Sequence, residues 1–504
     1  MKRIIALIGI ATLLFGCAKD FENLEDPNWD PELAVAITHS RFEVKDVLND
    51  FETGGYVGTN ENGVIRVVYQ GEIFSITAED VMEVDNIPFA FLSKNQEGTI
   101  PSFQGRRIET MTLKAGIMSY QVVDSRNEDI RITITIPIAL KNGVPFSETF
   151  VVSPSGGSIN KSGTFDLSGY VFDFSTGGDG ANYLSMKYDA ELVNSGTVVD
   201  VDLIQGTFKG LQFQFLDGYL GDFELGSFSD SVSIDMFKNY IGGEVVISEP
   251  RIALNLYNSF GMPLQTSIND IEGSGSNGNV ALTGSPFNEP QELNIPDLTD
   301  VEPALTIVEF DGANSNLDDF ISNSPAKVNF TVEGSANVNK DSSQYNWVRD
   351  TSKLTLDVDI EIPMVGRISG VHIKDEFAFD FSEFEDIESA TFKLIIENRF
   401  PVAADIQLYY LDEFSNILDS LLPDEDRLFS PSIVDNEGFS ISPTTETNYF
   451  EMNAEKFDRV KDTRTVRMIL VFQTSDEGQS IVRFHEDDYL DLKMGLITKV
   501  SSTQ

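Results

Sequence analysis

The sequence predicts an all-β protein made of tandem antiparallel β-sandwich modules with a few short helices. The first observation is a hydrophobic period of two in Arg131–Ile136, where isoleucines alternate with arginine and threonine. The same alternation recurs in Ile252–Tyr257 and Asp357–Ile362. It is typical of antiparallel strands with one buried and one solvated face. The second observation is that turn-forming pairs such as Asn142-Gly143 and Asn277-Gly278 separate these runs.

The composition indicates how large a core the chain can bury and which classes of partner it excludes. Hydrophobic residues make up 41% of the 504 positions, with 37 Phe, which is enough for a sizeable core. Chains of this length contain about two to four domains. The net charge of −46 argues against nucleic acid as a partner, because phosphate binding needs Lys and Arg. The single Cys excludes a disulfide framework and a Cys-rich zinc site.

Residues 1–16 have the form of a lipoprotein signal peptide. Basic residues precede the apolar run Ile4–Phe15, which is too short for a spanning helix of about 20 residues. Leu13–Cys17 resembles the bacterial lipobox, and the only cysteine of the chain stands at its end. The resemblance implies that Cys17 is the lipid anchor, that it carries palmitate or similar acyl chains, and that it holds the protein in the outer membrane.

Residues 17–31 are expected to form an acidic tether between the anchor and the folded body. Within it, Lys19, Asp20 and Glu22 follow the cysteine and resemble the export signal of surface lipoproteins in the Bacteroidota. The resemblance implies a protein that faces the cell exterior. A solvated tether on the periplasmic side has the same composition and is the alternative.

Segments rich in Gly, Ser, Asn and Pro near 153–157 and 273–300 indicate linkers. We therefore expect an N-terminal β domain over 32–155, a first β-sandwich module over 156–285, a linker over 286–300 and a second β-sandwich module over 301–504.

The expected helices are few and short. The candidates are Lys45–Phe51, Leu317–Ile321 and Ala454–Val460. Ser315 and Asp318 have the Ser-x-x-acid spacing of a capping box, which predicts the start of the second helix.

Part of the chain is predicted to be duplicated. Three blocks align in the same order, which suggests one sheet-forming unit used twice with different loops. Chance similarity between alternating strands is the alternative. The aligned blocks are Val199–Gly210 with Leu356–Gly370, Asp230–Asp235 with Asp375–Asp380, and Arg251–Phe260 with Thr391–Phe400.

The last of these blocks ends in Asn-x-Phe with a Pro close behind, in Asn258–Pro263 and again in Asn398–Pro401. This pattern resembles β-sandwich modules of the LEA-14, water-stress type, and implies that the Asn ends its strand by bonding the turn backbone. More broadly, Trp29–Leu33, Phe213–Leu220 and Tyr489–Gly495 resemble an uncharacterised family of Bacteroidota surface lipoproteins. That resemblance implies a location and an all-β fold but no activity.

No motif predicts catalysis. The chain has no nucleophile elbow, zinc-protease, P-loop or dinucleotide fingerprint, and its acidic residues are too numerous to single out a pair. His39, His372 and His485 are scattered and are expected to be structural. We expect no enzyme activity, no cofactor and no metal centre. Asp311–Asp319 leaves a bound calcium ion open, against the alternative of a turn followed by a helix.

The expected function is that of an accessory or scaffold subunit of an outer-membrane β-barrel complex for uptake, secretion or assembly. A membrane anchor raises the effective concentration of weak contacts, and antiparallel sheet edges can accept an added strand. The alternative is a surface ligand-binding protein for glycan, lipid or peptide. The sequence leaves open whether a sandwich encloses an apolar cavity. The candidate aromatic platform residues are Phe213, Phe215, Tyr240, Tyr409 and Tyr410.

Overall fold

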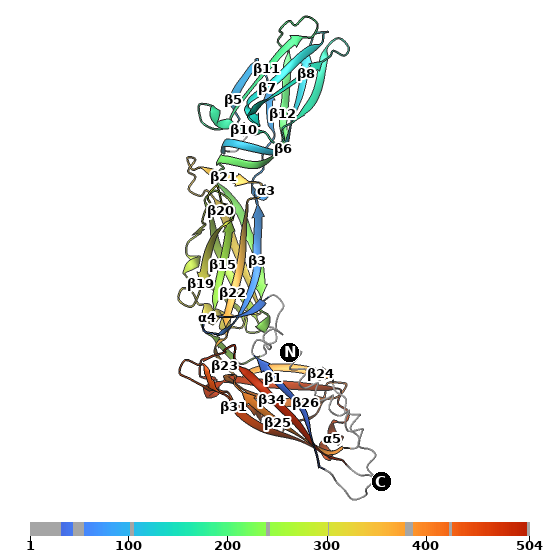
Figure 1. Ribbon diagram of the computed structural model, residues 1–504, viewed down its shortest axis with the longest axis vertical. Helices are drawn as coiled ribbons and strands as arrows, with labels where there is room; N and C mark the ends of the chain where they lie inside the picture. Colours follow the sequence, from blue (N-terminus) through green and yellow to red (C-terminus); the bar gives the residue numbers. More distant parts are fainter. Residues whose placement is uncertain are drawn as a thin grey trace.

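The computed structural model describes residues 32–43, 55–100, 105–237, 242–300, 302–378, 387–422 and 426–500. Strands dominate these residues and the helices are short, which confirms the predicted all-β class. Three bodies lie one after another along the longest axis of the molecule (Figure 1). We call them the head, the middle module and the basal module, from the top to the bottom of that view.

The head is a sandwich of two sheet layers that are joined at one corner by β10 (Val171–Asp173), which pairs with a strand of each layer. A short helix, α3 (Ala78–Val81), precedes it in the chain, and η2 (Phe174–Thr176) follows β10. The first layer has the order β4 (Ile87–Ala90), β12 (Leu203–Tyr219), β6 (Arg107–Asp124), β9 (Ile159–Asp166). The second layer has the order β8 (Val144–Val152), β7 (Ile130–Lys141), β11 (Tyr183–Leu192), β5 (Asn95–Thr99).

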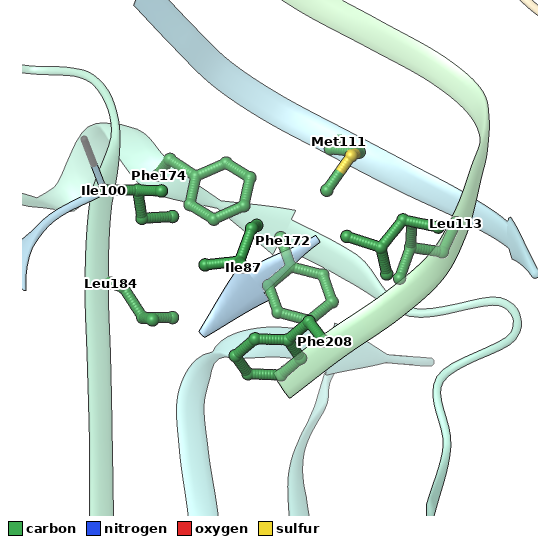
Figure 2. Close-up of a pocket in the computed structure, with 9 residues that line it drawn as sticks. Ile87, Ile100, Met111, Leu113, Phe172, Phe174, Leu184 and Phe208 are labelled. Carbon is green, nitrogen blue, oxygen red and sulfur yellow. The ribbon is translucent and has the colours of Figure 1, made fainter. Parts of the chain in front are cut away.

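Apolar side chains from both layers fill the interior of the head. Figure 2 shows Ile87, Met111, Leu184 and Phe208 pointing toward one another from different strands. The cavity left between them and their neighbours is about 10 Å³, close to the smallest volume that holds one water molecule. The interior is therefore packed at this point, and this cavity has no room for a ligand.

The middle module also consists of two layers. One has the order β19 (Ala304–Phe310), β15 (Arg251–Asn258), β22 (Lys353–Pro363), β3 (Ile65–Thr77), β2 (Gly55–Thr59). The other has the order β13 (Phe223–Ser233), β20 (Lys327–Ala336), β16 (Leu264–Gly275), β17 (Gly278–Ala281), with β18 (Gln291–Glu292) also paired to β16. The remaining elements of this part of the chain are η3 (Asp235–Phe237), β14 (Glu244–Ile247), η4 (Ser285–Phe287), α4 (Leu317–Ser322) and β21 (Asn346–Arg349).

The basal module contains the two ends of the described chain. One layer has the order β31 (Thr444–Asn453), β25 (Ile387–Asn398), β34 (Tyr489–Val500), β1 (Glu32–Glu43). The other has the order β24 (Val371–Ala378), β32 (Thr465–Thr474), β26 (Val402–Leu411), β27 (Ile417–Ser420), with β28 (Asp426–Phe429) also paired to β26. The remaining elements are β23 (Val365–Ser369), β29 (Ile433–Val434), β30 (Ser440–Ser442), α5 (Ala454–Val460), α6 (Ser475–Gly478) and β33 (Val482–Arg483).

The middle and basal modules share one topology, which supports the predicted duplication. The neighbours of β15 are β19 and β22, and the neighbours of β25 are β31 and β34. In the opposite layers, β13, β20 and β16 pair in the same order as β24, β32 and β26. Two of the three aligned blocks therefore fall on equivalent strands. The third pair of blocks does not. Val199–Gly210 runs into β12 of the head and Leu356–Gly370 begins in β22 of the middle module, whereas the strand equivalent to β22 is β34 of the basal module.

The buried asparagines Asn258 and Asn398 end equivalent strands in the same way. The Oδ1 atom of each accepts the backbone N–H two residues later, at 2.8 Å from Phe260 and 2.9 Å from Phe400. The Nδ2 atom of Asn258 donates to the carbonyl of Asn294, and that of Asn398 donates to the carbonyl of Ser430. Each side chain thus satisfies the backbone where the strand turns away from its sheet.

The three bodies are nested in the chain rather than consecutive, so the sheets do not follow the predicted boundaries. β1 pairs with β34, which brings His39 to Asp491 across 452 residues. The boundary predicted near 155 lies inside the head, because β9 pairs with β6 across it. The linker predicted over 286–300 lies inside the middle module, because β16 pairs with β20 across it. Local alternation identifies a strand but not its distant partner.

Two of the three predicted helices are present, as α4 and α5. The predicted capping box of α4 is wrong, because its N-cap is Asn316 and the hydroxyl of Ser315 donates to the carbonyl of Asp311. The helix α5 is capped by Asn453, whose Oδ1 atom accepts the N–H of Lys456 at 2.9 Å. Residues 45–51 lie outside the described residues.

Candidate ligand-binding groove on the head

The outer face of the first head layer is hollowed into an open groove of about 870 Å³. Four neighbouring strands, β4, β12, β6 and β9, supply its floor. Its lining residues are Pro88, Phe89, Ala90, Ser119, Tyr120, Gln121, Ser162, Gly163, Thr164, Gln205, Gly206, Thr207 and Lys209.

The register of the four strands places the polar side chains of the groove on one face. Residues directly opposite each other in an antiparallel sheet point to the same side. One row of such partners across the strands is Ala90, Gln205, Gln121 and Ser162, and the next outward row is Pro88, Thr207, Ser119 and Thr164. The groove therefore presents two parallel rows that are mainly amides and hydroxyls.

A chain of side-chain hydrogen bonds fixes the amides of this face. The Nε2 atom of Gln205 donates to Oε1 of Gln121 at 3.1 Å, and Nε2 of Gln121 donates to Oδ1 of Asn160 at 2.9 Å. The hydroxyl of Ser119 donates to the carbonyl of Thr207 at 3.0 Å. Since a primary amide has two N–H groups and two acceptor lone pairs, both glutamines keep donor and acceptor capacity beyond these bonds.

Aromatic rings brace the inner face of the same strands. A side chain at Gly206 would lie 2.6 Å from the ring of Phe89, and one at Gly163 would lie 2.4 Å from the hydroxyl of Tyr120. Both glycines therefore let a ring cover the backbone closely. The ring of Tyr120 also stacks on Phe165 with 5.0 Å between centroids, and burial raises the pKa of its phenol. The floor of the groove is held from below by packed rings.

The lining of the groove carries no carboxylate, and its one charged side chain is that of Lys209. The whole chain has 81 Asp and Glu against 35 Lys and Arg. The groove is thus a neutral to weakly positive surface on a strongly acidic protein.

The junction between the head and the middle module fixes the orientation of the groove. β21 pairs with β12 of the head, and Trp347 within it exchanges two backbone hydrogen bonds of 3.0 Å with Gly261 of the middle module. Beside it, the buried carboxylate of Asp217 accepts from the N–H and hydroxyl of Thr110 and from the hydroxyl of Tyr345 at 2.9 Å. Burial and this carboxylate raise the pKa of Tyr345 to about 12.

The predicted aromatic platforms do not form one surface. Phe213 and Tyr410 are core residues, of the head and the basal module respectively, and burial raises the pKa of the Tyr410 phenol. Phe215 and Tyr409 are partly buried in these two separate bodies, and Tyr240 lies outside the described residues. The groove was missed because its amides and hydroxyls are ordinary outward residues of alternating strands.

The candidate calcium loop forms a turn followed by α4. The Oδ1 atom of Asp311 accepts the N–H groups of Ala313 and Asn314 at 2.9 and 3.0 Å, and Oδ1 of Asn314 accepts the N–H of Asp311. These oxygens are therefore used by the backbone of the turn. Among the described residues, no group of three or more His, Cys, Asp or Glu side chains is placed to hold a metal ion.

The predicted anchor Cys17 and export residues Lys19, Asp20 and Glu22 lie outside the described residues, as do the signal peptide 1–16 and the tether 17–31. In the described part of the chain, no helix has the length and apolar character required to cross a membrane.

No family model matches the chain, and no curated protein does. Among solved structures, a candidate secreted protein from Parabacteroides distasonis ATCC 8503 shares 11% identity, with 92% of this chain and 99% of that chain covered and a TM-score of 0.27. The VP2 subviral particle of infectious bursal disease virus shares 8% identity, with 78% and 73% covered and a TM-score of 0.17. The resemblances to LEA-14 modules and to a Bacteroidota lipoprotein family stay predictions.

Proposed function

We propose that the protein is a non-catalytic, lipid-anchored surface protein of the outer membrane that presents the head as a ligand-binding body. The observation that supports this is the order of the bodies along the long axis (Figure 1). The first described strand, β1, lies in the basal module, and the head lies at the opposite end. The predicted tether 17–31 spans at most about 50 Å when fully extended. The basal module then stays near the membrane and the middle module acts as a spacer.

The groove supports binding rather than catalysis. Most enzymes that hydrolyse glycosidic bonds use a pair of carboxylates across the scissile bond, and the groove lining has none. The packed interior of the head argues against a lipid enclosed between its layers. The groove is broad and open, and its volume of about 870 Å³ lies within the range of ligand sites.

The scaffold role on an outer-membrane barrel complex is the second candidate. It is favoured by β31, which ends its sheet within the described residues and pairs only with β25. Such a strand offers backbone groups for strand addition by a partner. Since β31 lies in the basal module, a membrane-embedded partner would reach it more easily than it would reach the head.

The two roles are separated by a mild-detergent pull-down of the full-length tagged lipoprotein from its own membranes, followed by mass spectrometry. The ligand-binding role predicts recovery without a stoichiometric barrel protein. A stoichiometric barrel partner would replace it with the scaffold role.

The surface location is tested in the same cells with an epitope inserted at Gly196, in the turn between β11 and β12. We expect antibody access on intact cells, and release of the protein from the membrane fraction in the Cys17→Ala variant. Access only after permeabilisation would contradict the proposal.

A further inference from the structure

We propose, on the basis of the ligand-binding role above, that the groove of the head binds a neutral glycan chain and releases it unchanged. The inference starts from the chemistry of the outward rows. Neutral sugars present hydroxyl groups that both donate and accept hydrogen bonds. Primary amides and hydroxyls are the side chains with the same dual capacity, and Gln121, Gln205, Ser162 and Thr164 bring them together on the groove floor.

The groove is arranged before the ligand arrives. The hydrogen bonds from Gln205 to Gln121 and from Gln121 to Asn160 hold the two central amides in one orientation. Both glutamines stand on strands that pair on both sides, β12 between β4 and β6, and β6 between β12 and β9. Side chains and strands that are already ordered lose little conformational entropy on binding.

Charge selects a neutral chain over an acidic one. A net charge of −46 repels polyanions before they reach the surface. A neutral ligand avoids this repulsion, and the absence of carboxylates from the lining removes the need to desolvate an acid on binding. One lysine, Lys209, does not offset the charge of the whole chain.

The same geometry disfavours an extended peptide and a lipid. A peptide adds to a sheet through an unpaired strand edge, and among the described residues of this layer such edges lie only at the margins of the groove, at β4 and β9. The backbone of β12 and β6 at the centre of the groove is already paired on both sides. An acyl chain needs an apolar surface, and the outward rows contain only Pro88 and Ala90 as apolar side chains. A glycan chain meets side chains across the face of the sheet and needs no free backbone.

Affinity gel electrophoresis of the full chain in mild detergent tests this assignment. The gels contain dextran, laminarin, galactomannan or xylan as neutral probes, and polygalacturonate as the acidic probe. We expect at least one neutral polysaccharide to retard the protein and polygalacturonate to have no effect. The double variant Gln121→Ala/Gln205→Ala should weaken this retardation at least tenfold, and Ser162→Trp should block the groove sterically.

The matched control is Thr133→Ala/Thr149→Ala, which removes a cross-strand hydroxyl pair, 2.8 Å apart, from the outer face of the second layer. Melting temperatures of all variants show whether they fold. Retardation by none of the neutral polysaccharides, or retardation that folded groove variants retain, would overturn the assignment. The proposed surface role would survive either result if the epitope at Gly196 is accessible on intact cells. An inaccessible epitope together with groove-dependent retardation would instead overturn only the surface role.

Discussion

The carboxyl group of Asp488 is predicted to destabilise the junction between the basal and middle modules at neutral pH. Its side chain is 1% exposed, and burial raises its pKa from 3.8 to about 6. It accepts the N–H of His485 at 2.8 Å, while Nε of Arg399 lies 3.8 Å away. The same loop reaches the middle module, where the N–H of Glu486 donates to the carbonyl of Gly63.

The raised pKa sets both the sign and the size of the effect. The folded state holds the proton of Asp488 more tightly than the unfolded state does. The stability that comes from this protonation is therefore complete below pH 3.8 and is lost as the pH rises through 6. Compared with a carboxyl of unperturbed pKa, Asp488 therefore costs the folded state about 3 kcal/mol at pH 7.5, where it is ionised, and about 1.6 kcal/mol at pH 5, where it is mainly protonated. The shift already includes the attraction of Arg399 and His485 and the repulsion of Asp487.

Asp488→Asn keeps an oxygen to accept the N–H of His485 and removes the charge. We expect it to raise the free energy of unfolding by about 2–3 kcal/mol at pH 7.5, roughly twice the gain at pH 5. Differential scanning calorimetry of the full chain at both pH values measures the shift of the basal transition. The control is Asp487→Asn, whose side chain is 75% exposed, and which should have little effect. An equal gain at both pH values, or a loss at pH 7.5, would refute the reasoning.

Three further substitutions test the duplicated turn, the head junction and the groove floor. Asn398→Ala removes the amide that bonds the carbonyls of Phe400, Val402 and Ser430, and should cost about 2–3 kcal/mol in denaturant unfolding; an unchanged midpoint would contradict this role of the turn. Tyr345→Phe leaves Asp217 without one donor. It should cost about 1–2 kcal/mol and increase proteolysis between the head and the middle module, whereas unchanged protease resistance would argue against the bond. Gly206→Ala places a methyl group 2.0 Å from the carbonyl oxygen of Ser119 and should lower the melting temperature of the head. An unchanged melting temperature would contradict this close contact.

The sequence was sufficient for features that depend on local pattern. Alternation predicted the strands, the run Ala454–Val460 predicted α5, and the shared Asn-x-Phe predicted equivalent turns at Asn258 and Asn398. It was insufficient for pairing, because the residues that meet in a sheet can lie anywhere in the chain. The block Val199–Gly210 was misassigned for this reason, since an alternating strand of the head resembles one of a module.

The groove was beyond sequence reasoning for a related cause. Gln121 and Gln205 each look like a solvated residue on an alternating strand, and nothing near either one indicates the other. Only the register that places β6 beside β12, with β4 and β9 outside them, brings their amides together. Asp and Glu are abundant in this chain, so a set of thirteen lining residues without a carboxylate is informative. The sequence alone does not show which residues form that set.

The duplication also explains how the three bodies are joined. In the middle module the head is inserted between β3 and β13, and in the basal module the whole middle module is inserted between β1 and β24, the equivalent strands. In both modules, the segment before the last strand contacts the neighbouring body. In the middle module β21, which precedes β22, pairs with β12 of the head. In the basal module His485, which precedes β34, forms a β-bridge with Val64 of the middle module. The junction between the head and the middle module is therefore crossed by the outgoing chain after β3, by the returning chain before β13 and by the bracing strand β21. Three connections across a junction restrict bending more than the single linker of consecutive domains does.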